Sequence, residues 1–201
     1  MSTADTLQQM YERMLGQLGP QHWWPAESAF EVMVGAILTQ NTNWKNVERA
    51  IDNLKRAGML SLPALSELPL ALLAEYIRPA GYYNIKAGRL KNLLNHIVDQ
   101  HGADVQAFLN QPLASFREQL LSIKGIGRET ADSILLYAAG LPIFVVDAYT
   151  HRILLRHNLI DEDYGYEGIQ ELFMDHLSCE AALYNEFHAL LVKVGNCYCK
   201  K

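Results

Sequence analysis

The sequence predicts an all-α fold, and three observations lead to this prediction. Apolar residues recur every three or four positions in several segments, a spacing that places them on one face of a helix. Residues that end or start helices separate these segments, as Gly19-Pro20 and Ser28 do. No stretch shows a convincing alternation of apolar and polar residues, so no strand is predicted.

Length and composition limit the class of protein. The chain has 201 residues, half of them apolar, which is enough to bury one sizeable core or two small ones. The N-terminal residues lack the features of a signal peptide, and no apolar run reaches eighteen residues, so we expect a cytoplasmic protein without a membrane segment. Cys179, Cys197 and Cys199 match neither a disulfide framework nor a four-ligand metal site.

The charge is unevenly distributed along the chain. The net charge of −5 argues mildly against nucleic acid as a partner, because Lys and Arg usually supply that affinity. Residues 76–98, however, contain Arg78, Lys86, Arg89 and Lys91 and no acid, whereas residues 161–186 contain acids and no Lys or Arg. We therefore expect one basic face, with Lys86, Arg89 and Lys91 exposed on one helix.

The helices follow one another along the chain. Residues 7–18 predict a packing helix, and residues 30–38, which follow a capping box from Ser28 to Glu31, predict a central one because they are apolar all round. Further helices are expected over about 43–57, in two short pieces between 61 and 77, over 85–98 after a loop at 78–84, near 104–109, over 112–121, over 128–139, from 147 to about 155, over 164–177 and over 180–194.

A glycine hairpin lies between two of these helices. Gly125 and Gly127 can adopt φ > 0 and let another backbone come close, so bare N–H groups can point outward where the next helix begins. Such a helix N-terminus carries roughly half a positive charge and suits one phosphate of a nucleic acid. Taken alone, a G-x-G is more often only a tight turn.

The flanks of the hairpin carry a family resemblance. The run from Ile123 to Ala131, with Asp147 eighteen residues after Glu129, resembles the helix–hairpin–helix and Gly/Pro…Asp signature of the endonuclease III superfamily of DNA base-excision glycosylases. The resemblance covers about residues 28–195. It implies two lobes with the active site in the cleft between them: residues 28–142 with the hairpin, and residues 1–27 plus 143–201.

The resemblance also assigns residues to DNA contacts. Asp147 would be the catalytic aspartate, and its structural role as a helix N-cap is compatible with that function. Gln40, in a polar loop, matches the wedge that fills the gap left by a flipped base, although such residues usually satisfy backbone groups. Tyr82 matches a second wedge, although it could be a packed surface residue. The phosphate would contact Lys124, Gly125, Gly127, Arg128 and Thr130, and a monovalent cation would bind the carbonyls of Leu121, Ile123 and Ile126.

Two features indicate the reaction and the substrate. Relatives that also nick the strand carry a lysine where this chain has Glu129, and a carboxylate cannot form an imine, so a monofunctional enzyme is predicted. Trp23, Trp24, Pro25 and Trp44, with Glu129, would form the base pocket, although the tryptophan pair could equally flank a domain junction. An aromatic slot holds a flat cation well, which favours alkylated purines. The pattern resembles the endonuclease III-like branch of 3-methyladenine DNA glycosylases.

The expected partner is double-stranded DNA with a damaged base, bound by a monomer. No cofactor is expected, because the iron–sulfur cluster of many relatives needs cysteines spaced C-x6-C-x2-C-x5-C, and Cys199 would be followed by none of the other three. Two alternatives remain. One is a glycosylase for mispaired thymine or adenine, and the other is a helix–hairpin–helix module that binds DNA without chemistry and needs neither Asp147 nor Glu129.

Overall fold

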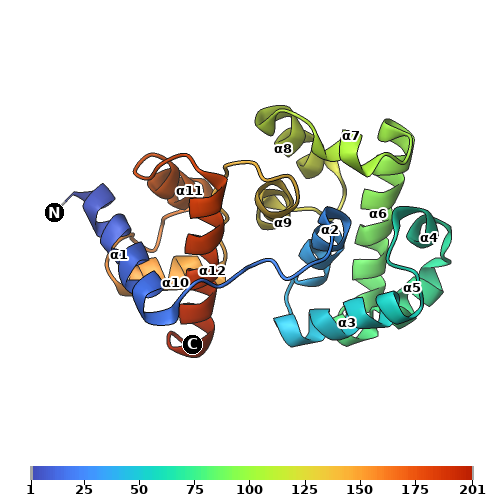
Figure 1. Ribbon diagram of the computed structural model, residues 1–201, viewed down its shortest axis with the longest axis horizontal. Helices are drawn as coiled ribbons and strands as arrows, with labels where there is room; N and C mark the ends of the chain where they lie inside the picture. Colours follow the sequence, from blue (N-terminus) through green and yellow to red (C-terminus); the bar gives the residue numbers. More distant parts are fainter. Residues whose placement is uncertain (1, 201) are drawn as a thin grey trace. The chain divides into compact units, whose positions relative to one another are not determined.

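The computed structural model describes residues 2–200, and over this range the regular elements are all helical (Figure 1). Their bounds are α1 Thr3–Leu18, α2 Ala29–Leu38, α3 Trp44–Arg56, α4 Leu62–Glu67, α5 Leu70–Tyr76, η1 Arg78–Ala80, α6 Tyr83–His101, α7 Val105–Leu109, α8 Leu113–Ser122, α9 Arg128–Ser133, η2 Ile134–Ala138, α10 Ala148–Arg156, α11 Tyr166–Met174 and α12 Ala181–Cys197. None of the helices within residues 2–200 combines the length and apolarity that crossing a membrane requires. The predicted fold class is confirmed.

The chain divides into two compact units. One comprises residues 26–139, and the other comprises residues 1–25 together with 140–201. The resemblance implied boundaries after residues 27 and 142.

Helix α2 forms the centre of the unit of residues 26–139. All of its residues from Phe30 to Leu38 are buried, and it packs against α3, α6, α9 and η2. This arrangement follows from the sequence, because a helix that is apolar all round is stable only when other helices surround it.

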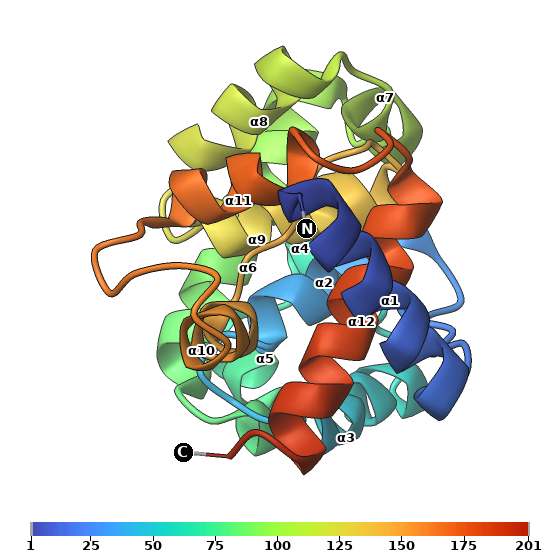
Figure 2. The same cartoon turned by 90° about the vertical axis from the view of Figure 1, so that its left-hand side faces the viewer.

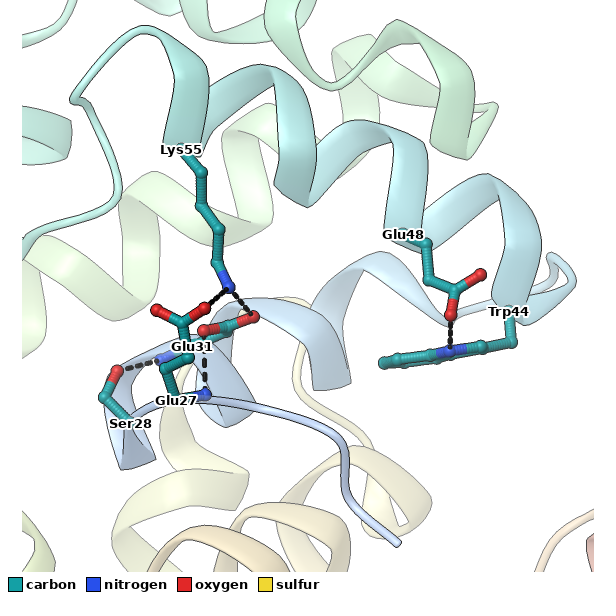
Figure 3. Close-up of polar contacts among 6 residues, drawn as sticks. All are labelled: Glu27, Ser28, Glu31, Trp44, Glu48 and Lys55. Atoms are coloured by element: carbon teal, nitrogen blue, oxygen red, sulfur yellow. Dashed lines mark hydrogen bonds and ion pairs between the residues drawn. The ribbon is translucent and has the colours of Figure 1, made fainter.

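The start of α2 differs in one detail from the predicted capping box. The Ser28 hydroxyl accepts a hydrogen bond from the Glu31 N–H, as expected, but the Glu31 carboxylate accepts from the N–H of Glu27 instead of that of Ser28. Lys55 of α3 lies 2.9 Å from both Glu27 and Glu31, as Figure 3 shows. The ion pair with Lys55 draws the Glu31 carboxylate toward α3 and so links α2 to α3.

The prediction of an exposed basic face on α6 is wrong. Lys86 is only 1% exposed, and Lys91 is half-buried with its ammonium donating to the carbonyls of Leu65 and Ser66, both at 2.7 Å. Arg89 is half-buried and donates to the side chain of Gln40. The sequence pattern misled because cations that end inside the protein, on helix C-terminal carbonyls, have the same spacing as cations on a solvated face.

Two element boundaries also differ from expectation. The loop expected at 78–84 contains the short helix η1, and α6 begins at Tyr83 because the Lys86 N–H already donates to the Tyr82 carbonyl at 3.0 Å. The second hairpin helix does not continue as an α-helix to Ala139, since its hydrogen bonding widens to a π-helix in η2.

The two hairpin helices are joined by a buried ion pair. Arg117 of α8 contacts Asp132 of α9 through two hydrogen bonds of 2.7 and 3.1 Å, and the Asp132 side chain is fully buried. A two-point contact of this kind fixes orientation as well as distance. It therefore holds α8 and α9 in register and sets the path of the hairpin between them.

Helix α12 forms the centre of the other unit, where it packs against α1 and α10 (Figure 2). Phe144, in the segment that precedes α10, stacks on Phe173 of α11 with ring centroids 3.8 Å apart. Tyr184, Phe187 and His188 of α12 meet the Phe144 ring edge to face. This cluster anchors the segment that leads to Asp147.

Candidate active site

The hairpin between α8 and α9 requires a glycine at only one of its two positions. Gly125 has φ +98°, and a Cβ built there would lie 2.3 Å from Cγ of Arg89. Gly127 has an ordinary φ of −95°, and a Cβ there would meet no atom within 4 Å. Gly125 is therefore fixed by the fold, whereas Gly127 leaves open space in front of the first N–H groups of α9.

The hairpin backbone is held from both sides. The Ile126 N–H donates to the Ile123 carbonyl at 3.0 Å, which closes the turn. Asn92 of α6 donates its side-chain amide to the Lys124 carbonyl at 2.8 Å. The side chains of Lys124 and Arg128 are exposed, so both charges of the predicted phosphate site can reach a ligand.

Gln40 connects the loop after α2 to this hairpin. Its amide nitrogen donates to the Gly125 carbonyl at 3.2 Å and to the Thr130 hydroxyl at 2.9 Å, and its amide oxygen accepts from Arg89. The predicted wedge residue therefore lies against the hairpin between α8 and α9. Thr130 is buried, and its hydroxyl accepts this hydrogen bond from Gln40.

Tyr82 lies at an exposed tip. Its side chain is 66% exposed, and its backbone adopts the left-handed region with φ +47°. Ile85, three residues further along the chain, is 56% exposed. Ile85 lies in the first turn of α6, so two large exposed apolar side chains stand close together in sequence, as is typical of a surface that packs against a partner.

The Asp147 carboxylate is fixed by α10. Asp147 is the N-cap of this helix, and its Oδ1 accepts from the Thr150 N–H at 2.7 Å and from the Thr150 hydroxyl at 2.9 Å. The side chain of Asp147 is 12% exposed, and Thr150 is fully buried. The structural role expected for Asp147 is thus present, and it leaves Oδ2 directed elsewhere.

His188 of α12 lies beside that second oxygen, with Nε2 3.8 Å from Oδ2 of Asp147. Burial lowers the pKa of the His188 imidazole, although the Asp147 charge acts in the opposite direction. Burial is the larger of the two causes, so the surroundings of His188 disfavour the protonated imidazole.

The residues expected to form the base pocket belong to both units. Trp23, Trp24 and Pro25 lie in the unit with the chain termini, where the Gln21 N–H donates to Glu186 of α12 at 2.7 Å and holds their segment. The Trp23 and Trp24 rings are half-buried, with centroids 5.1 Å apart and planes at 48°.

Trp44 and Glu129 lie in the unit of residues 26–139. Trp44 is the first residue of α3, and its indole N–H donates to the Glu48 carboxylate at 2.7 Å (Figure 3). Glu129 is exposed in the first turn of α9, where the partial positive charge of the helix end favours a carboxylate.

No group of three or more His, Cys, Asp or Glu within residues 2–200 is arranged to hold a metal ion. The three cysteines are not joined by disulfides. Groups of such side chains do not include the hairpin carbonyls of Leu121, Ile123 and Ile126, which could bind a monovalent cation because such an ion needs only oxygen ligands. The Ile123 carbonyl accepts one hydrogen bond and keeps a second lone pair for such an ion.

The sequence did not reveal several residues that contact Gln40, the hairpin or Asp147. Arg89, Asn92 and His188 each act across a long sequence separation, so periodicity carries no signal for them. Asp132 could have been recognised, because it is the only charged residue in the stretch 130–136, and a lone acid among mostly apolar residues indicates a buried ion pair.

The sequence matches a known family over most of its length. The model of the HhH-GPD superfamily base excision DNA repair protein matches residues 34–179. This range contains the hairpin, Gln40, Tyr82 and Asp147.

Individual relatives agree with the family match. A candidate DNA repair glycosylase of Methanocaldococcus jannaschii is 46% identical over 198 residues, which is 98% of this chain and 90% of that protein. The H. pylori 3-methyladenine DNA glycosylase, solved with bound 1,N6-ethenoadenine, superposes with a TM-score of 0.84 and 31% identity over 98% of each chain. A trapped endonuclease III–DNA covalent intermediate gives a TM-score of 0.85 at 21% identity, covering 100% of this chain and 90% of that one, and it shows the fold alone.

Proposed function

We propose that this chain, which belongs to the HhH-GPD superfamily of base excision DNA repair proteins, is a monofunctional DNA glycosylase that removes alkylated purines such as 3-methyladenine from double-stranded DNA. The observation that carries the proposal is the Asp147 carboxylate. One of its oxygens is fixed by Thr150, and the other lies beside the buried His188, where burial disfavours a positive charge on the imidazole.

The reaction is hydrolysis of the N-glycosidic bond. The bonding electrons leave with the base nitrogen, positive charge develops on the sugar, and water adds to C1′ and loses a proton. A carboxylate that is already oriented stabilises the developing charge without reorganisation. Asp147 can do this because α10 holds it and because its side chain is largely shielded from water.

The base must first leave the helical stack, which costs a few kcal/mol and least for damaged bases. We propose that Gln40 and Tyr82 fill the vacancy while the hairpin binds phosphate through Lys124, Gly125, Gly127, Arg128 and the N–H of Thr130. Insertion of the Gln40 side chain would exchange its present hydrogen bonds for contacts with the bases. A monovalent cation on the carbonyls of Leu121, Ile123 and Ile126 would complete the hairpin.

The substrate class rests on the aromatic residues. Alkylation at N3 or N7 makes a purine cationic and a good leaving group, so no strong general acid is needed. Indole faces attract such cations, and the Glu48 carboxylate beside Trp44 adds a negative charge near that ring. The likeness to the H. pylori 3-methyladenine DNA glycosylase supports the same substrate class.

The absence of lyase chemistry is directly testable. Because Glu129 has no amine to attack C1′, borohydride should trap no covalent complex, and the abasic product should stay uncleaved until alkali is added. The assay would compare this enzyme with endonuclease III, whose covalent intermediate has been trapped, as the positive control. Trapping of the unmodified chain would refute the monofunctional mechanism.

The substrate class is tested by Trp44→Ala. We expect this variant to lose more activity on 3-methyladenine than on neutral hypoxanthine or uracil, because only the cation also loses its attraction to the indole face, worth roughly 0.5–2 kcal/mol. Single-turnover excision of each base measures the ratio. Trp44→Phe keeps an aromatic ring without the indole, so its ratio of excision rates should fall between those of the wild type and Trp44→Ala.

Two results would change the substrate assignment. If the wild type prefers a neutral lesion, or if Trp44→Ala slows all substrates equally, a glycosylase for mispaired thymine or adenine becomes the better description. If the protein binds duplexes but releases no base from any of them, it is a binding module.

A further inference from the structure

Two helix ends in the unit of residues 26–139 share one buried cation. The Lys86 ammonium donates to the carbonyl of Leu38 at 2.9 Å and to the carbonyl of Ala80 at 2.7 Å. Leu38 is the last residue of α2, and Ala80 is the last residue of η1. Carbonyls at helix ends lack intrahelical donors and carry partial negative charge, so one cation can satisfy both.

Each of these carbonyls directly precedes a loop that the proposed function assigns to DNA. The loop at 39–43 follows Leu38 and carries Gln40, and the loop at 81–82 follows Ala80 and carries Tyr82. We propose that Lys86 is a positioning residue that sets the spacing between these two loops, so that Gln40 and Tyr82 act on the duplex as one body. The inference rests on the proposed function.

The cost of burying Lys86 supports a role beyond filling space. Its side chain is 1% exposed, and burial lowers the pKa of its ammonium to about 8, with the nearby charge of Arg89 as a smaller cause. A leucine or methionine would occupy the same volume without this desolvation cost. An apolar side chain, however, cannot fix the direction of two carbonyl groups.

Arg89, three residues along α6, extends the same arrangement. Its guanidinium donates to the amide oxygen of Gln40, and its Cγ lies so close to Gly125 that a Cβ there would overlap it. The loop at 39–43 is therefore fixed to the loop at 81–82 by Lys86 and to the hairpin by Arg89.

Lys91 provides a matched control on the same helix. Its ammonium also donates to two carbonyls, those of Leu65 and Ser66 near the end of α4, and neither belongs to a loop assigned to DNA. Lys86→Met and Lys91→Met therefore remove the same kind of contact, and only the first should disturb the positions of Gln40 and Tyr82.

The experiment measures three quantities for the wild type and both variants. These are the unfolding midpoint, the affinity for an undamaged duplex, and the fluorescence of 2-aminopurine placed opposite a tetrahydrofuran abasic-site analogue, which reports local unstacking. We expect both variants to be less stable and both to keep the affinity for undamaged DNA. Only Lys86→Met should lose the fluorescence rise, and its single-turnover excision of hypoxanthine or 3-methyladenine should fall by roughly 10- to 100-fold, as for small misplacements of reacting groups.

Different results would contradict the positioning role of Lys86 and the proposed glycosylase function. If Lys86→Met and Lys91→Met behave alike in all measurements, the positioning role is wrong while the proposed function stands. If the wild type itself produces no fluorescence rise and releases no base, the proposed function fails and the inference fails with it.

A measurement on the wild type decides the question if Lys86→Met does not fold. Hydrogen–deuterium exchange should show the amides of residues 39–43 and 81–84 gaining protection together on the abasic-analogue duplex, with far less change on the undamaged duplex. Protection of only one of the two loops would overturn the inference.

Discussion

Asp147→Asn is expected to bind damaged duplex like the wild type and to lose base excision by ~10² or more, the size seen when a preorganised electrostatic partner is removed. The asparagine oxygen can still accept from the Thr150 N–H, so the cap of α10 survives. What is lost is the negative charge that would face the developing positive charge on the sugar. Single-turnover excision and duplex binding measure the two effects separately.

Asp104→Asn is the matched control for this variant. Asp104 caps α7 by accepting from the N–H groups of Gln106 and Ala107, so its substitution also exchanges a capping carboxylate for an amide. Its excision rate should not change. Excision by Asp147→Asn at close to the wild-type rate would remove Asp147 from the catalytic role.

Gly125→Val is expected to weaken binding to damaged and undamaged duplexes alike, by roughly tenfold or more. Valine is strained at φ +98°, and its Cβ would overlap Arg89, so the hairpin must distort; strain of this kind costs about 1–3 kcal/mol. The loss should not depend on the base, since phosphate contacts carry no sequence information. Titration of both duplexes at one salt concentration gives the comparison.

Two further variants separate strain from the loss of phosphate contact. Gly102→Val introduces similar strain at φ +59° beyond the end of α6, and it should lower stability without weakening binding. Gly127→Ala adds a methyl group in open space, so it should leave stability unchanged and weaken binding if a phosphate approaches there. A loss by Gly125→Val confined to damaged duplex would contradict the phosphate role.

Local sequence determined most of the helices and one part of the candidate site, the cap position of Asp147. The mostly apolar stretch at 30–38 after the cap at Ser28 predicted a buried helix, and α2 is buried along almost its whole length. The position of Asp147 before a helical pattern predicted its cap on α10, which is present. These features depend on residues three or four positions apart, so they can be predicted without knowing how the rest of the chain folds.

Only the tertiary structure decided which groups the charged side chains of α6 contact. Lys86, Arg89 and Lys91 have the spacing of a solvated basic face, yet each side chain reaches a group that lies far away in the sequence. The same holds for His188, which meets Asp147 only because α10 packs against α12. Periodicity fixes the face on which a long side chain starts, but the helix ends and loops packed around that face determine what its charged group contacts.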